Sequence, residues 1–156
     1  MDAGDPFDLQ RFVTAQAPVM PAVMAELKAG AKRSHWMWFV FPQLAALGRS
    51  GTARHYGIAS LDEARAYLAH PVLGARLKDC CRVLLGVPGR SAHAIFGSPD
   101  DLKLRSCLTL FHRADPAESL FAECLARYYG GVPDAATAGL LGTGGGSAEG
   151  AYSRPL

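Results

Sequence analysis

The sequence has no apolar run close to the roughly 18 residues that a membrane-spanning helix requires. It also lacks the basic leader of a secretory protein, because its first five residues, Met1 to Asp5, are acidic instead. These two absences argue against a membrane protein. We therefore expect a soluble, cytoplasmic protein for which no membrane is a partner.

Cysteine is scarce, and the four cysteines present form no recognisable metal or disulfide pattern. Cys80 and Cys81 are adjacent, whereas Cys107 and Cys124 lie within apolar helical patterns. Free cysteine in a cytosolic protein behaves as a small buried hydrophobe, so we predict reduced thiols in the core. No Cys-x-x-Cys or His-Glu-x-x-His spacing is present to preset a zinc site, and the sequence indicates neither a metal nor another cofactor.

An excess of charge of one sign is missing as well. The 16 Lys and Arg residues against 14 Asp and Glu give a net charge of +2, and no basic run extends beyond the pair Lys32-Arg33. Proteins that bind nucleic acid by electrostatics cluster many more cations. Nucleic acid is therefore not expected as the main partner, and the sequence leaves the oligomeric state open.

Apolar residues and helix-start signals are abundant. With 156 residues, of which 49% are hydrophobic, the chain can build one core of ordinary size. The pairs Asp5-Pro6, Ser98-Pro99 and Asp115-Pro116 each place a capping side chain before a proline, as at the first turn of many helices. Ser60 and Glu63 have the spacing of a capping box, which marks a fourth helix start.

These signals predict an all-α protein: a single compact domain over residues 5–141 with about eight to ten short helices. A glycine-rich tail over residues 142–156 is expected to be mobile, and no Walker-type lysine follows its glycines. Residues 38–41 favour a strand by composition, but a lone strand leaves its backbone groups unpaired, so we expect helix there. The helices are predicted at residues 6–16, 19–29, 35–47, 51–57, 61–69, 72–86, 91–96, 99–113, 116–129 and 135–141.

Residues 32–43 form the strongest candidate for a site, because both tryptophans of the chain lie among cations, a histidine and an amide. Aromatic faces can stack on a flat ring while cations and amides bind phosphate or carboxylate. The expected ligand-binding residues in this segment are Lys32, Arg33, Trp36 and Gln43. Trp36 and Trp38 face different sides of a helix, and we expect Trp36 to face the ligand and Trp38 to lie in the core.

His35 is the candidate proton-transfer residue, because its free pKa lies near neutrality. The alternative is a structural histidine that donates to a backbone carbonyl. Asp101 is the second candidate catalytic residue, since a carboxylate can align water or stabilise an oxocarbenium-like centre. The alternative is that Asp101 merely caps its helix.

Lys103 and Ser106 share one face near the start of the predicted helix 99–113. A helix N-terminus carries partial positive charge, so these two residues could hold a phosphate or a sugar hydroxyl. The alternatives for Lys103 are an ion pair with Asp100 or Asp101, or an amine that extends into solvent.

Five sequence blocks resemble a microbial protein family, the domain-of-unknown-function family 1810, whose members sometimes carry a calpastatin-like label. The resemblance covers about residues 5–141 and implies an all-helical single domain, but it implies no activity. A calpastatin-like inhibitor would be disordered and polar, whereas this chain has enough apolar residues for a core. A looser similarity, in size, helical class and a lysine-plus-aromatic pocket, is to the NADAR superfamily, which implies ADP-ribose chemistry. The five blocks are residues 32–43, 60–64, 67–74, 95–103 and 106–111.

Together these observations predict a pocket for an anionic small molecule of the nucleotide type, with ADP-ribose or an NAD-related compound as the specific expectation. If the protein is an enzyme, hydrolysis of a glycosidic bond is the expected reaction. The alternative is a helical module without catalysis that binds a peptide or partner protein through an aromatic groove, with Trp36, Trp38 and Phe41 as anchors.

Overall fold

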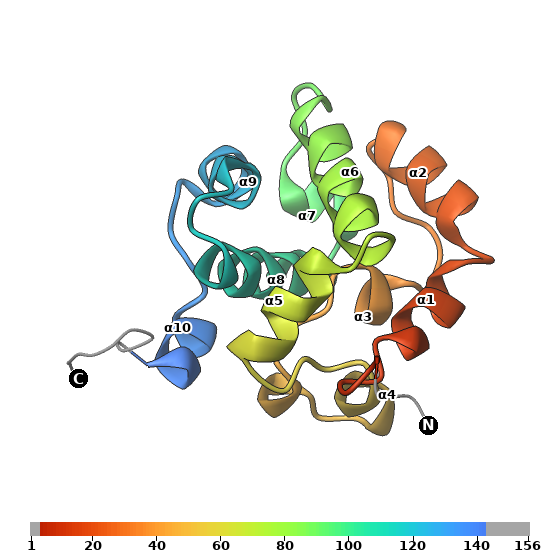
Figure 1. Cartoon of the computed structure of the whole chain (residues 1–156). Coiled ribbons are helices and arrows are strands. Elements are labelled where there is room, and N and C mark those ends of the chain that lie inside the picture. Colours follow the sequence, from red (N-terminus) through yellow and green to blue (C-terminus); the bar gives the residue numbers. More distant parts are fainter. Residues whose placement is uncertain (1–3, 143–156) are drawn as a thin grey trace.

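The computed structural model describes residues 4–142, and all regular elements within that range are helical (Figure 1). The predicted all-α class is therefore confirmed. The predicted mobile tail falls almost wholly outside the described residues, since only Gly142 of that range is described, as the C-cap of the last helix. The elements are α1 (Gln10–Gln16), α2 (Met20–Lys28), α3 (Met37–Val40), the 3-10 helix η1 (Ala45–Leu47), α4 (Gly51–His55), α5 (Leu61–Ala69), α6 (Leu73–Leu85), α7 (Ala92–Phe96), α8 (Asp100–Ala114), α9 (Ser119–Tyr129) and α10 (Ala135–Leu141).

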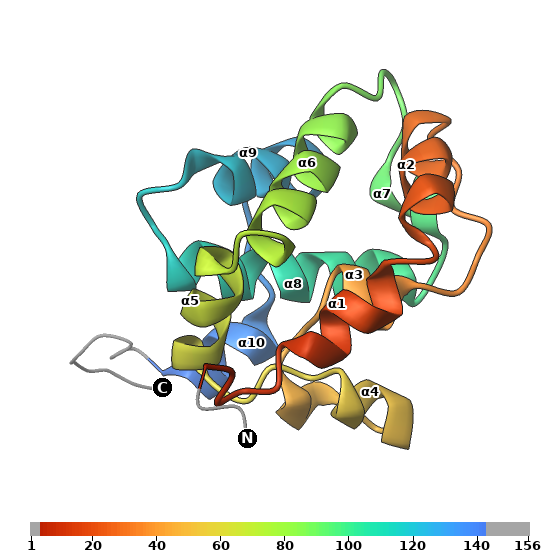
Figure 2. The same ribbon diagram turned by 45° about the vertical axis from the view of Figure 1, so that its right-hand side comes forward.

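The long helix α8 lies at the centre of the molecule and contacts α5, α7, α9 and α10 (Figures 1 and 2). The predicted stripe of Leu104, Leu108 and Phe111 is fully buried, and Cys107 and Leu110 extend the burial to other faces of the helix. A helix that is apolar on several sides is covered on several sides. The fold is thus organised around α8, and the first turns of this helix line a cavity.

A chain of aromatic rings links α8 to the rest of the core. Tyr67 of α5 lies 5.2 Å from the ring of Phe12 on one side and 5.2 Å from that of Phe111 on the other, and Phe121 of α9 follows at 6.0 Å from Phe111. Such tilted and edge-on pairs add to the free energy gained by burying the rings. The core therefore connects the N-terminal helices with α8 and α9.

The predicted helix starts are present, but the helices begin later than the prolines. Asp5 does cap, since its carboxylate accepts from the amides of Leu9 (2.7 Å) and Gln10 (3.0 Å), yet α1 starts at Gln10. Residues 116–118 likewise form a turn before α9, and its cap is Glu118 rather than Asp115. A capping side chain followed by proline can thus open a turn that precedes the helix.

One of the two hydrogen bonds of the predicted capping box at the start of α5 is present. The Ser60 hydroxyl accepts from the amide of Glu63 at 3.2 Å. The Glu63 carboxylate reaches back to the amide of Ala59 (2.8 Å), one residue before the cap, and it also pairs with Arg11 at 3.0 Å. Glu63 is therefore buried as part of an ion pair.

The predicted single helix over residues 35–47 is wrong in its second half. Helix is present over Met37–Val40, as expected for the aromatic run, but it ends there because Pro42 disfavours helical geometry in Phe41. The chain then forms one isolated parallel bridge between Leu44 and Ile58. The Ala45 amide donates to the Ile58 carbonyl (2.8 Å), and the Ile58 amide donates to the Gln43 carbonyl (2.9 Å). Residues 45–57, which contain η1 and α4, therefore form a long loop whose two ends are held together by these hydrogen bonds.

All four cysteines are buried free thiols in the core. Burial raises the pKa of the Cys80 thiol to about 12, and burial also holds the pKa of Cys107 well above its usual value. The Cys80 and Cys107 thiols therefore remain protonated at neutral pH, and the burial of all four cysteines agrees with the predicted core thiols. Separately, none of the helices between residues 4 and 142 is both long and apolar enough to cross a membrane.

Candidate ligand-binding site

The structure reverses the roles expected for the two tryptophans. Trp36 is fully buried, and its indole N–H donates to the carboxylate of Glu26 at 3.0 Å. Its ring packs against Phe41 and Phe96 in the core. Trp36 is therefore a core residue, and the expectation that it faces a ligand is corrected. Trp38, two residues later, is partly exposed and lines a cavity.

Glu26 of α2 organises the segment before α3, which sequence reasoning missed. Its carboxylate accepts from the amides of Arg33 (2.8 Å) and Ser34 (3.0 Å) and from the Ser34 hydroxyl (2.5 Å), besides the Trp36 indole. Partial burial raises the pKa of this carboxyl, but the four hydrogen bonds outweigh it and lower the pKa to about 2. Glu26 is therefore ionised at neutral pH and fixes the loop that leads to Trp38.

Lys32 lies against the same loop and forms an ion pair. Its ammonium is 2.9 Å from Oδ2 of Asp100, donates to the carbonyl of Ser34 at 2.6 Å and lies 5.0 Å from the centroid of the Trp36 ring. Its side chain is only 8% exposed. Lys32 is thus occupied by protein groups and does not line the cavity.

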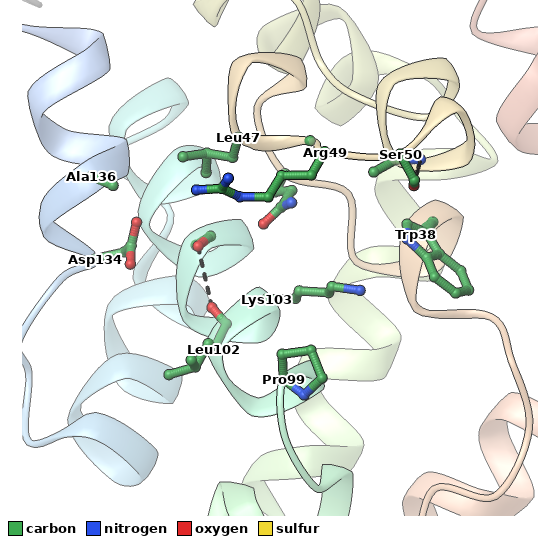
Figure 3. A pocket seen from close by; sticks show the side chains of 13 residues that line it. Trp38, Leu47, Arg49, Ser50, Pro99, Leu102, Lys103, Asp134 and Ala136 are labelled. Atoms are coloured by element: carbon green, nitrogen blue, oxygen red, sulfur yellow. Dashed lines mark hydrogen bonds between the residues drawn. The ribbon is translucent and has the colours of Figure 1, made fainter.

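The cavity lies between α3, the loop that follows Pro42, the first turns of α8 and the start of α10 (Figure 3). Its volume is about 460 Å³. Three residues expected at the site, Gln43, Lys103 and Ser106, line this cavity, so the structure brings together two segments that are distant in sequence. The other polar or aromatic residues on its wall include Trp38, Arg49 and Asp134.

Lys103 extends along the cavity wall toward Trp38 (Figure 3). Its ammonium lies 4.5 Å from the centroid of the indole ring and 3.7 Å from Oδ1 of Asp100, with the side chain 22% exposed. The ion pair expected as an alternative role is therefore present, but the amine also remains at the cavity. A cation over an indole face is held by the ring quadrupole.

Ser106 and Gln43 supply neutral hydrogen-bonding groups. The Ser106 hydroxyl donates to the carbonyl of Leu102 at 3.2 Å, one turn earlier in α8 (Figure 3), which leaves its oxygen able to accept a further bond. The Gln43 side chain makes no hydrogen bond within the described part of the chain, and its amide can both donate and accept.

Asp134 and Arg49 add charge that sequence reasoning did not predict. One carboxylate oxygen of Asp134 caps α10 by accepting from the amide (2.9 Å) and hydroxyl (2.6 Å) of Thr137, and the Asp134 amide donates to Thr109 at 2.8 Å. Arg49 is exposed, and Figure 3 shows its side chain extending across the cavity. A signal for Asp134 was available, since it directly precedes the predicted helix 135–141, but nothing local marked Arg49.

The remaining expected site residues lie outside the cavity. Arg33 and His35 are exposed and do not line it. Asp101 accepts from the Ser98 hydroxyl (2.9 Å) and from the Leu102 amide (2.9 Å), and lies 3.4 Å from Nδ1 of His93. Asp101 is the second residue of α8, whose N-cap Pro99 has no side-chain capping bond, so the Asp101 carboxylate makes only local bonds at the helix start. Neither candidate catalytic residue, His35 or Asp101, therefore lines this cavity.

The site contains no preassembled metal centre. No cluster of three or more His, Cys, Asp or Glu side chains within residues 4–142 has the geometry to hold a metal ion.

The structure is thus an all-helical fold with a mixed polar and aromatic cavity at the first turns of its central helix. The chain belongs to the family described as Protein of unknown function (DUF1810), whose model matches residues 6–141. The family resemblance carried by the sequence blocks is therefore confirmed. No comparison supports the looser similarity to the NADAR superfamily.

A solved relative shares this fold. The chain is similar to the conserved hypothetical protein Rv1873 from Mycobacterium tuberculosis, known from a crystal structure, with 59% sequence identity and a TM-score of 0.86. The match covers 87% of this chain and 97% of the relative. No protein with a curated description matches the chain significantly.

Proposed function

We propose that the cavity beside Trp38 binds a small anionic molecule that contains a flat ring. The observation that carries this proposal is the convergence of Trp38, Gln43, Lys103 and Ser106 on one cavity of about 460 Å³. Cavities of this size suit small organic ligands, which are held by apolar surface and a few placed polar groups.

The charges on the cavity wall favour an anion. Lys103 and Arg49 carry two positive charges and Asp134 one negative charge, so the wall has a net charge of +1. Asp100 and Trp38 share the Lys103 ammonium, whereas Arg49 makes no ion pair within the described residues. A ligand anion would therefore gain most from Arg49, with Lys103 as its second partner.

The neutral groups suit a sugar or a base. Ser106 and Gln43 can bond hydroxyl or ring nitrogen atoms, and the Asp134 oxygen that does not cap α10 can accept from a hydroxyl. A ring can pack on the exposed part of Trp38. Nucleotide-type ligands combine all these features, and ADP-ribose and NAD are the first compounds to test.

Binding without turnover is the function that we propose. A glycosidic-bond hydrolase would need an acid or base in contact with the ligand, and His35 and Asp101 do not line the cavity. Asp134 is the carboxylate on the wall, but its Oδ2 is occupied in capping α10. The alternative of an aromatic groove for a partner protein loses two of its three anchors, because Trp36 and Phe41 are buried.

Calorimetric titration with ADP-ribose, NAD, AMP and adenosine tests the proposal. We expect at least one nucleotide to bind, and Trp38→Ala and Lys103→Met each to weaken it by about tenfold, which corresponds to the loss of about 1.4 kcal/mol. Trp38→Phe is the matched control, because it keeps a flat ring. Absence of binding by all four compounds at millimolar concentration, or affinities unchanged in both variants, would overturn the proposal.

A further inference from the structure

A second cavity, of about 490 Å³, adjoins the first. The two share Leu47, Gly48 and Arg49 as a common wall, and the second also contacts Arg54 of α4. Arg54 does not line the first cavity. The loop 45–57 therefore places two arginines, Arg49 and Arg54, in the wall of a cavity next to the proposed ring site.

These two arginines differ from most others in the described chain. Most of the other arginine side chains in the described range donate to protein acceptors: Arg11, for example, donates to the carbonyls of His55, Phe7 and Gly57 at 2.7–2.9 Å and pairs with Glu63. Arg49 and Arg54 are exposed and donate to no protein group among residues 4–142. Their guanidinium groups keep five donors each for a ligand.

The local sequence leaves this charge uncompensated. Residues 27–61 contain no Asp or Glu, but they contain five Lys or Arg residues. A carboxylate neighbour would neutralise an arginine and reduce its attraction for an incoming anion. Asp134 reaches the wall of the first cavity from α10 but does not line the second. The second cavity is thus the more cationic of the two.

We propose that Arg49 and Arg54 form a subsite for the phosphate group of the ligand whose ring lies beside Trp38. A guanidinium bonds phosphate through two parallel N–H donors, and two guanidinium groups suit a doubly charged phosphate. The shared wall places this subsite next to the ring site, as the joined ring and phosphate of a nucleotide require. This inference rests on the proposed function and adds the position and chemistry of the anionic group.

Titration calorimetry with ADP, adenosine and pyrophosphate on the full chain tests the subsite. Arg54→Ala is the decisive variant, because Arg54 lines only the second cavity. Loss of a charged hydrogen-bonding partner is expected to weaken ADP binding about tenfold or more. Adenosine affinity should stay within twofold, since adenosine has no phosphate. Arg33→Ala is the matched control: Arg33 is also exposed, its side chain has no protein acceptor in the described range, and it lines neither cavity.

The outcomes separate the two proposals. If Trp38→Ala weakens ADP binding and Arg54→Ala does not, the phosphate subsite is wrong and the ring site stands. If pyrophosphate binds as tightly as ADP and depends on Arg54, the subsite stands and the ring beside Trp38 contributes nothing. If ADP and pyrophosphate both fail to bind the unmodified chain at millimolar concentration, the subsite is overturned, and the ring site then depends on adenosine alone.

Discussion

The ammonium of Lys32 lies 2.9 Å from the carboxylate of Asp100, which joins the loop before α3 to the first turn of α8. The same carboxylate is 3.7 Å from Lys103, the residue that extends over Trp38. One aspartate thus orients a core-facing lysine and a cavity-facing lysine. This contact links the aromatic segment to α8.

Asp100→Asn should destabilise the protein by about 2 kcal/mol, because it leaves the largely buried Lys32 ammonium without its counter-charge. Urea denaturation monitored by circular dichroism measures the change. Asp79→Asn is the matched control, since the Arg82–Asp79 pair has side chains 57% and 60% exposed and should contribute less than about 1 kcal/mol. Equal effects of the two substitutions would contradict a structural role for the Lys32–Asp100 pair.

The Glu26 carboxylate should make stability depend on pH at the acid end. Its pKa is lowered to about 2 in the folded protein from 4.5, so its contribution is fully present above about pH 4.5 and is lost as the pH falls toward 2. We expect Glu26→Gln to cost about 2 kcal/mol at pH 7, with the deficit shrinking toward pH 2. Thermal unfolding from pH 2 to pH 7 measures it. Glu123→Gln, which alters an exposed carboxylate that accepts one bond from Ser119, is the control and should cost less than about 0.5 kcal/mol at pH 7.

Arg11 should be important for stability and not for ligand binding. It bonds four backbone carbonyls besides the Glu63 carboxylate, and so ties α1 to the end of α4 and to α5. Arg11→Ala leaves buried Glu63 without its counter-charge and should cost about 3 kcal/mol. Arg11→Ala combined with Glu63→Gln should recover part of that loss in the same denaturation experiment. A double variant less stable than Arg11→Ala would contradict this account.

Two helical glycines should respond oppositely to alanine. A Cβ at Gly74 in α6 would lie 2.1 Å from the Leu68 carbonyl oxygen, so Gly74→Ala forces α5 and α6 apart and should cost about 2 kcal/mol or more. A Cβ at Gly139 in α10 meets no atom within 4 Å, and Gly139→Ala should stabilise by about 0.5–1 kcal/mol. Melting temperatures of the two variants check both signs. A neutral Gly74→Ala would show that the two helices do not approach so closely.

The helical architecture was predictable because its signals are local. Ser60 with Glu63 fixes the start of α5, and the apolar stripe from Leu104 to Phe111 fixes the buried face of α8. The predicted helix starts after Asp5 and Asp115 were several residues too early, because a capping residue followed by proline can begin either a turn or a helix. The end of α3 was missed because the effect of Pro42 on Phe41 was outweighed by an apolar pattern that continues beyond it.

The site was predictable only in part, because side-chain partners far along the chain decide which residues remain available. The Trp36 indole is hydrogen-bonded to Glu26, and the Lys32 ammonium is paired with Asp100. Neither Trp36 nor Lys32 therefore lines the cavity. Gln43, Lys103 and Ser106 remain at the cavity. Neither Glu26 nor Arg49 lies in a pattern that a single sequence marks as functional.

The two backbone bonds that join Gln43 and Ala45 to Ile58 have an evolutionary consequence. A loop whose two ends lie side by side can change in length without displacing the elements that flank it. The span that carries Arg49 and Arg54 can therefore diversify while the core stays fixed. Relatives with the same scaffold are therefore expected to differ most in the length and charge of this span.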